Sequence, residues 1–327
     1  MRLAIAVALG SGLLAACNQV STPTTETPEA SVPTGWTVIS TTSNPANTAQ
    51  GAANLNAVSG VSDTAVWVVG DRGSIGHWNG TTLLWEPSGT TVNLRGVWAL
   101  DAEDAYAVGD RGTILERTAS GWHPVGAGVT LQVLTAVWAD TTRVVAVGSN
   151  GTVILGGAAG YQLIATTHTE NLFGVTGTLG GPVTMVGALG IVLSLNGTTL
   201  ALTTLPNSPN LPSCGTMCIL SGATTGPNNS YFVGQEGIVF RVDATGLNNV
   251  AGCPPSALRS VATVGANAWI VGWDGTICKI EGATATSFPY SDTRWFNGIY
   301  AASASSLWVV GASGTLFHGL PLAMAVK

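Results

Sequence analysis

A pair of glycines separated by two residues recurs seven times along the chain, each time after a β-favouring run. The first glycines stand at positions 70, 109, 148, 187, 234, 272 and 311, so the steps are 39, 39, 39, 47, 38 and 39 residues. The longer step holds an insertion around residues 206–218. A fixed period of this length is typical of repeat architectures, in which each unit is one supersecondary structure.

Each unit contains four short β-rich segments, which we label strands a to d. In the second unit they are residues 94–100, 105–109, 112–118 and 121–125. Four short strands per unit, repeated around a ring, are the signature of a β-propeller blade.

The two ends of the chain complete one blade. The last unit has strands a (297–301), b (307–311) and c (314–319) but no strand d. The segment 35–40, "GWTVIS", matches strand d of the second unit and precedes the first strand a. Pairing it with the last unit would remove an open sheet edge. We therefore predict an all-β, seven-bladed β-propeller over residues 35–319, closed by the N-terminal strand, with a C-terminal tail over 320–327.

The first 16 residues have the layout of a secretory signal peptide. Arg2 is followed by an apolar run to residue 16, which is too short to span a bilayer as a helix. The sequence Leu14-Ala15-Ala16-Cys17 resembles the lipobox of bacterial lipoproteins. This resemblance implies cleavage before Cys17 and a lipid on that cysteine. The alternative is an ordinary secreted protein with a chance cysteine.

Residues 18–34 are rich in Thr, Ser, Pro and Glu without an apolar period, which is typical of a flexible tether. We expect a lipoprotein signal peptide over 1–16, a lipidated Cys17 with its tether over 17–34, and an extracytoplasmic location in the bacterial cell envelope. Asn18, where inner-membrane lipoproteins often have Asp, favours the outer membrane or cell surface.

Composition argues against several classes of partner. The chain is 46% hydrophobic and 9% charged, with a formal net charge of −6 and no basic run. Nucleic-acid binding calls for clustered Lys and Arg, and an acidic surface disfavours anionic lipid. We therefore predict neither nucleic-acid binding nor peripheral binding to lipid.

The unit W-x-V-G-x-x-G-T-I resembles repeats of bacterial extracytoplasmic propellers across residues 35–319. This group includes the photosystem II assembly and stability factor family and many lipoproteins. The Asp-box of sialidases, Ser-x-Asp-x-Gly-x-Thr-Trp, is absent. The resemblance implies a scaffold or chaperone-like binding role and supplies no catalytic residue.

Four cysteines follow Cys17, an even number that suggests disulfides in an oxidising compartment. Three pairings are possible. We favour Cys214–Cys218, within the insertion, and Cys253–Cys278, because the loop before the sixth blade and its strand c should meet at one rim. Zinc is the alternative, but the spacing does not match a zinc ribbon. No cofactor is predicted.

Two strand positions vary between the units in informative ways. The position three residues before each first glycine is mostly occupied by large residues, which favour packing between blades. The alternative is an aromatic platform that binds sugars. The residues at this position are Trp67, Tyr106, Val145, Thr184, Tyr231, Trp269 and Trp308. The position four residues after each second glycine is mostly polar, which indicates a solvated strand face. The alternative is a metal site formed by its two histidines. The residues at this position are His77, Glu116, Leu155, Ser194, Arg241, Lys279 and His318.

The start of strand a should lie at the mouth of the central channel. Arg95 and Arg259 occupy equivalent positions there, and the other units place Asn56, Thr135, Phe173, Cys218 and Asn297. Arg294 is expected near the same mouth. The turns between strands b and c carry Asp71, Arg72, Asp110, Arg111, Glu236, Trp273 and Asp274, which we expect further out. Their glycines persist while the residues between them change, so we interpret the glycines as scaffold and this mixed-charge rim as the candidate ligand or partner site.

The resulting hypothesis is a lipid-anchored, non-catalytic binding or scaffold protein that engages an envelope protein through its loop rim. One alternative is a lectin-like propeller that binds glycans between its blades through tryptophans. Another is a hydrolase or lyase at the channel mouth that acts on an anionic substrate through Arg95 and Arg259.

Overall fold

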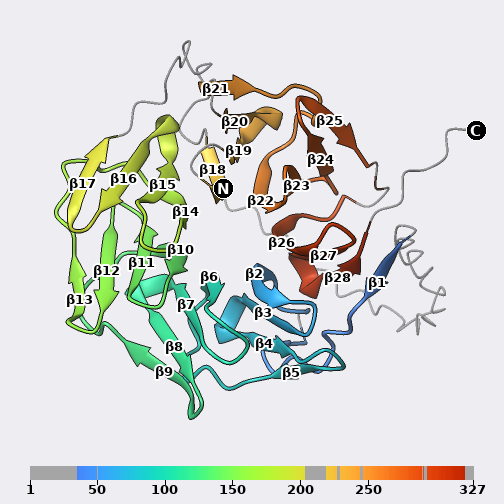
Figure 1. Ribbon diagram of the computed structural model, residues 1–327. Coiled ribbons are helices and arrows are strands. Elements are labelled where there is room, and N and C mark those ends of the chain that lie inside the picture. Colours follow the sequence, from blue (N-terminus) through green and yellow to red (C-terminus); the bar gives the residue numbers. More distant parts are fainter. Residues whose placement is uncertain are drawn as a thin grey trace, which may run out of the picture. The chain divides into compact units, whose positions relative to one another are not determined.

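The computed structural model describes residues 35–49, 51–202, 219–226, 229–243, 246–288, 290 and 293–320. These residues belong to one compact unit that spans residues 32–327. They form seven four-stranded antiparallel sheets, which are the blades of a β-propeller (Figure 1). Within the described ranges, no helix has both the length and the apolar character needed to cross a membrane.

The first three blades run in chain order. They comprise β2 (Leu55–Ser62), β3 (Ala65–Gly70), β4 (Ile75–Trp78) and β5 (Leu83–Trp85); β6 (Leu94–Ala99), β7 (Ala105–Gly109), β8 (Ile114–Thr118) and β9 (Gly121–Val125); and β10 (Leu134–Ala139), β11 (Arg143–Gly148), β12 (Val153–Gly157) and β13 (Gly160–Leu163).

The remaining four blades complete the ring. They comprise β14 (Leu172–Gly177), β15 (Val183–Gly187), β16 (Val192–Asn196) and β17 (Thr199–Leu202); β18 (Ile219–Gly226), β19 (Asn229–Gly234), β20 (Val239–Asp243) and β21 (Gly246–Asn249); β22 (Leu258–Val264), β23 (Asn267–Gly272), β24 (Ile277–Glu281) and β25 (Thr284–Ser287); and β26 (Phe296–Ser303), β27 (Ser306–Gly311), β28 (Leu316–Gly319) and β1 (Trp36–Val38).

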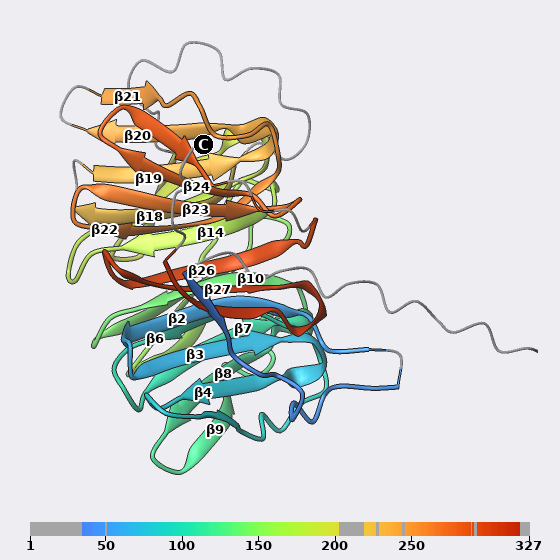
Figure 2. The same ribbon diagram turned by 90° about the vertical axis from the view of Figure 1, so that its right-hand side faces the viewer.

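The seven first strands line the centre and contact one another around a closed circle (Figure 1). Closure follows the predicted route, because β1 pairs with β28 in the order β1-β28-β27-β26. The register places Trp36 opposite Gly319 and Val38 opposite Phe317. In Figure 2 the dark blue β1 lies against the red strands from the other end of the chain. The predicted seven-bladed propeller is therefore confirmed, including its shared last blade.

The hydrophobic core lies between neighbouring blades. Trp67 of β3 is fully buried and packs with Leu94, Val97, Leu115 and Trp122 of the second blade. Trp308, Trp269 and Tyr231 are buried in the same way at later interfaces. Truncating such a tryptophan to alanine typically costs 3–5 kcal/mol, on the order of a third or more of a domain's stability. The interpretation of this strand position as inter-blade packing is confirmed.

The strand c position, which we interpreted as a solvated face, is only partly solvated: His77 is buried, and the other six residues are half-buried. His77 is opposite Trp67 in the register, and their rings stack with centroids 3.8 Å apart. His318 stacks on Trp308 at 4.2 Å, and Lys279 lies over Trp269. Directly opposed residues point to the same side of a sheet, so these polar side chains cover the buried aromatic residues.

The metal alternative finds no support in these contacts. His77 and His318 lie in different blade interfaces, against different tryptophans. Among the described residues, no group of three or more His, Cys, Asp and Glu side chains is placed to hold a metal ion. Burial lowers the pKa of His77 and so favours its neutral form.

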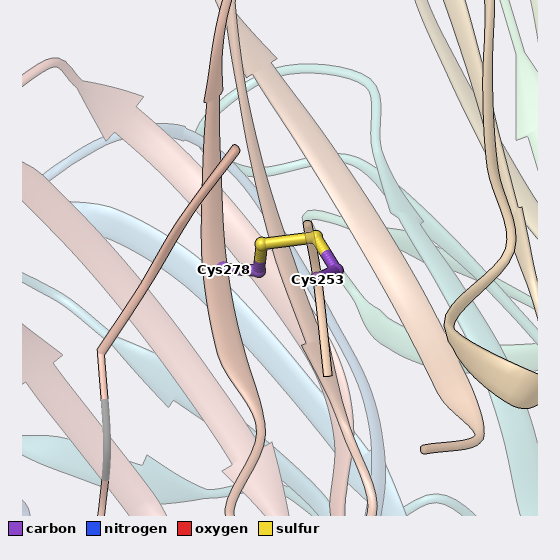
Figure 3. The surroundings of a disulfide bond; sticks show 2 residues. All are labelled: Cys253 and Cys278. Carbon is purple, nitrogen blue, oxygen red and sulfur yellow. A yellow bond between two sulfur atoms is a disulfide. The ribbon is translucent and has the colours of Figure 1, made fainter. Parts of the chain in front are cut away.

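A disulfide joins Cys253 to Cys278, with 5.8 Å between the two Cα atoms (Figure 3). It ties the loop before β22 to β24, and Cys278 is fully buried. This predicted pair is confirmed. Cys214 and Cys218 lie outside the described residues, so their pairing stays a prediction.

The two glycines of each repeat serve different purposes. Gly70 has an extended backbone, with φ −163°, but a Cβ there would collide with the carbonyl oxygen of Asn54. Gly73 has a positive φ of 75°, and a Cβ there would collide with the carbonyl oxygen of Thr90. The first glycine thus permits a close backbone approach, and the second also supplies a left-handed turn.

The residue between them is less free than its variable sequence suggested. In all seven turns the residue before the second glycine has a φ of 54–60°: Arg72, Arg111, Asn150, Leu189, Glu236, Asp274 and Ser313. In blades 1, 3 and 7 the N–H of this residue donates to an asparagine of the next blade. The N–H of Arg72 donates to Asn93 Oδ1 at 3.0 Å, and that of Ser313 donates to Asn54 Oδ1 at 2.9 Å.

Alanine at Gly73 is therefore expected to destabilise the ring more than alanine at Gly89. Gly89 has a similar φ of 71°, but a Cβ there meets nothing within 4 Å. Gly89→Ala should lower the free energy of unfolding by about 1–2 kcal/mol through backbone strain. Gly73→Ala should cost about 1–3 kcal/mol more because of the carbonyl collision. Urea denaturation of both variants measures the difference, and equal losses would contradict the close approach.

Candidate functional site: the mouth of the central channel

The central channel contains a cavity of about 440 Å³ lined by the first strands of the blades. The first residue of each of these strands pairs with the first repeat glycine, so the next residue is structurally equivalent in every blade. These equivalent residues are Asn56, Arg95, Thr135, Phe173, Leu220, Arg259 and Asn297. The placement of Cys218 in this set is wrong: Ile219 pairs with Gly234, so Leu220 takes that position.

Three polar members of this set bind the backbone of the next blade. Asn56 Nδ2 donates to the carbonyl of Leu94 at 2.8 Å. Thr135 Oγ1 donates to the carbonyl of Leu172 at 2.6 Å. Asn297 Nδ2 donates to the carbonyl of Leu55 at 3.0 Å. These bonds link successive blades around the mouth, so these donors are already engaged.

Two turn aspartates reach inward to the mouth, although we expected them further out. Asp71 accepts hydrogen bonds from Asn56 Nδ2 at 3.0 Å and from Asn54 Nδ2 at 2.8 Å. Asp110 forms an ion pair with Arg95 through the Arg95 Nε. In blades 1 and 2, therefore, the first turn residue satisfies the polar side chain at the start of strand a.

Blade 6 breaks this arrangement. Arg259 is equivalent to Arg95, but Trp273 stands where blade 2 has Asp110. The Arg259 guanidinium lies over the Trp273 ring, 5.8 Å from its centroid. Its Nε is buried and has no hydrogen-bond partner among the described residues. Burial, and secondarily the charge of Arg95, lowers the pKa of Arg259. The charged guanidinium therefore lies in an unfavourable environment.

Arg117 shows how this chain usually accommodates a buried arginine. Its guanidinium also lies over a tryptophan, Trp67, at 5.2 Å, with 13% of the side chain exposed. It donates to Glu103 Oε2 at 2.8 Å and lies 3.4 Å from Glu86 Oε1. Burial would lower the pKa of Arg117, but these two carboxylates raise it instead. Arg259 has the aromatic contact without the carboxylates.

The remaining rim residues are dispersed. Arg72 Nε donates to the carbonyl of Ala46 at 2.7 Å, and Arg111 and Asp274 are exposed. The guanidinium of Arg294 lies 6.0 Å from the ring centroid of Phe317, and Arg294 does not line the described cavity. The rim is therefore not one continuous site: Asn56, Arg95, Arg259 and Asn297 share the mouth.

Trp273 also stacks on Trp295, with ring centroids 4.5 Å apart and an interplanar angle of 14°. Trp295 is 49% exposed and precedes the first strand of blade 7. It is the one exposed tryptophan of the eleven in the chain. Sequence reasoning did not select it, although its place two residues before the Asn297 position was a usable signal.

A second cluster that sequence reasoning missed joins Asp63, Ser306 and His318. Ser306 Oγ lies 2.9 Å from His318 Nε2 and donates to the Asp63 carboxylate. Asp63 approaches the same His318 Nε2, at 3.7 Å. In a Ser-His-Asp triad the carboxylate holds the other imidazole nitrogen. This cluster therefore links blades 7 and 1 and does not have the geometry of a nucleophilic triad.

The comparisons with known proteins identify the fold. No family model matches the chain, and no curated protein matches it. Similar solved structures include YCF48 bound to D1 peptide, with a TM-score of 0.67, 14% identity and coverage of 90% of this chain and 99% of that one. A catalytically inactive virginiamycin B lyase from Staphylococcus aureus with quinupristin has a TM-score of 0.70, 10% identity and coverage of 84% and 98%. The WD40 propeller domain of Doa1 has a TM-score of 0.66 and 11% identity, with coverage of 83% of this chain and 94% of that one.

Replacing Arg259 should stabilise the protein, whereas replacing Arg117 should destabilise it. Arg259→Met removes an uncompensated charge and keeps a side chain that packs against Trp273, so we expect the free energy of unfolding to rise by roughly 1 kcal/mol or more. Arg117→Met leaves Glu86 without its cation and should cost about 1–3 kcal/mol. Urea denaturation at neutral pH tests both variants. Destabilisation by Arg259→Met would show that this guanidinium has a stabilising partner.

Proposed function

We propose that the protein is a lipid-anchored, non-catalytic binding protein of the bacterial cell envelope, which engages a protein partner through the rim around the channel mouth. The observation that carries this proposal is the exposed Trp295, stacked on Trp273 beside Arg259. Tryptophan and arginine are the residues most enriched at the energetic centres of protein interfaces. The two rings are already stacked on each other, which lowers the side-chain entropy that binding would cost.

Other apolar side chains are exposed on the same rim. Leu131, in the loop before β10, is 83% exposed, and Leu189, in the turn after β15, is 61% exposed. These loops and turns lie at the end of the blades that carries the mouth. YCF48, whose fold is similar, has been solved with a bound D1 peptide, which supports peptide binding as a use of such a propeller.

Glycan binding is the second candidate, and one observation favours it: a stacked, partly exposed tryptophan pair also suits the apolar face of a sugar. Binding between blades is less well supported, because Trp67, Trp269 and Trp308 are at most 2% exposed. For a hydrolase or lyase, the described lining of the channel offers Arg95 and Arg259, and the two acids that reach the mouth are engaged, Asp71 by asparagine amides and Asp110 by Arg95.

The anchor rests on the lipobox-like sequence that ends at Cys17. In a bacterial host, the wild-type chain should incorporate a labelled fatty acid and partition into the detergent phase of Triton X-114. Cys17→Ser should lose the label and partition into the aqueous phase. An unlabelled wild-type chain would contradict the anchor without affecting the role of the rim.

The partner surface is tested by photo-crosslinking in intact envelopes, with the photoreactive residue on the rim. We expect one reproducible protein adduct, reduced at least fivefold by Trp295→Ser. The matched control is Leu163→Ser, on the outer strand β13, where the side chain is 54% exposed. Equal adduct yields for the two variants would rule out the Trp295 surface, and binding to a glycan array would instead favour the second candidate.

A further inference from the structure

The charges at the channel mouth are not all paired. The protein has 17 acidic and 11 basic residues, with Lys and Arg counted as basic, yet its described channel lining includes two arginines and no acid. Arg95 is neutralised by Asp110, whereas Arg259 has no carboxylate partner among the described residues. Asp71 also reaches the mouth, so its two arginines and two aspartates balance, but Arg259 is the charged group there that has no partner of opposite charge among the described residues.

Arg259 is a partly buried cation without a carboxylate partner among the described residues, which is unfavourable for the folded state. Arg259 is equivalent to Arg95, and the turn residue that would neutralise it is Trp273 instead of an aspartate. The indole lies against one face of the guanidinium, so a ligand would bind through its N–H groups. A guanidinium edge donates two parallel hydrogen bonds to a planar carboxylate, and such bonds strengthen where water is excluded.

We infer that the channel mouth binds a carboxylate, with Arg259 as the direct ligand and Trp273 as the residue that orients it. Because this inference rests on the proposed function, the carboxylate belongs to the protein partner, either at its C-terminus or on an acidic side chain. One unpaired guanidinium matches the single charge of a carboxylate better than the nearly double charge of a phosphate. The adjacent Trp295 would pack against an apolar residue next to that acid.

Isothermal titration calorimetry of the full chain tests this with three probes at constant ionic strength. They are N-acetyl-diglycine, which ends in a peptide carboxylate, its C-terminal amide, and inorganic phosphate. We expect the carboxylate to bind with a Kd on the order of 1–10 mM and the amide to show no binding, because a single charge-assisted contact supplies only a few kcal/mol. Equal binding of the amide, or tighter binding of phosphate, would overturn the carboxylate assignment.

Two variants locate the binding on Arg259. Arg259→Met should weaken carboxylate binding at least tenfold, and so should Trp273→Asp, which recreates the neutralising turn of blade 2. Trp273→Asp leaves the arginine in place, so its effect separates charge compensation from loss of the side chain. Arg72→Met is the control, since that exposed arginine on the same rim bonds to Ala46. Unchanged binding in both test variants would exclude Arg259.

The same variants separate this inference from the proposed function. If Arg259→Met still yields the photo-crosslinked adduct at the wild-type level, partner binding through Trp295 stands and the carboxylate site is excluded from it. If the carboxylate probe binds but no adduct forms in any variant, the anion site stands and the protein partner does not.

Discussion

The ring depends on the burial of large side chains between neighbouring blades. A residue from the second strand of one blade, such as Trp67 or Trp308, enters the core shared with the next blade. Polar groups of the third strand, such as His77, then cover its ring. Because β1 supplies the missing outer strand of the last blade, β28 is paired on both sides and this blade has four strands like the others. The apolar contacts thus lie within the wall of the ring, whereas at the mouth hydrogen bonds from Asn56, Thr135 and Asn297 join successive blades.

This separation explains why the mouth varies while the repeat persists. The repeat glycines are fixed by close backbone approach and left-handed turns, whereas the first residue of each turn can be chosen freely. Asp71, Asp110 and Trp273 occupy that place in three blades. Each choice gives a different contact with the start of the first strand. Asp71 accepts hydrogen bonds from asparagine amides, Asp110 pairs with Arg95, and Trp273 leaves Arg259 without a carboxylate. Function can therefore be altered at the mouth with little effect on the fold.

Much of the fold was predictable because repetition multiplies a weak local signal. The glycine period indicated seven blades, and the segment 35–40 indicated how the ring closes. The pairing of Cys253 with Cys278 followed because the loop before the sixth blade and strand c of that blade were expected at one rim. Other features depend on three-dimensional register. The insertion before β18 hid that Leu220, and not Cys218, is equivalent to Arg95.

The state of the candidate site was harder to predict from the sequence. The equivalence of Arg95 and Arg259 was evident from the repeats. Whether each arginine is neutralised depends on whether the first turn residue, Asp110 or Trp273, can pair with it at the mouth, and no sequence pattern shows that this residue points inward. The left-handed backbone at Arg72 and its counterparts was missed for a similar reason, since it serves a hydrogen bond to a different blade. Tertiary contacts between repeats, rather than propensities within one repeat, decide these details.

The central claim is that Arg259 is an unpaired cation kept free for a carboxylate. A crystal structure of the protein grown without carboxylate buffers, followed by a soak in N-acetyl-diglycine, tests this most directly. We predict that the unsoaked crystal has no acidic side chain on the Arg259 guanidinium and that the soaked crystal has the carboxylate on its N–H edge. A guanidinium already paired with a protein carboxylate, or a mouth left empty after the soak, would contradict the account.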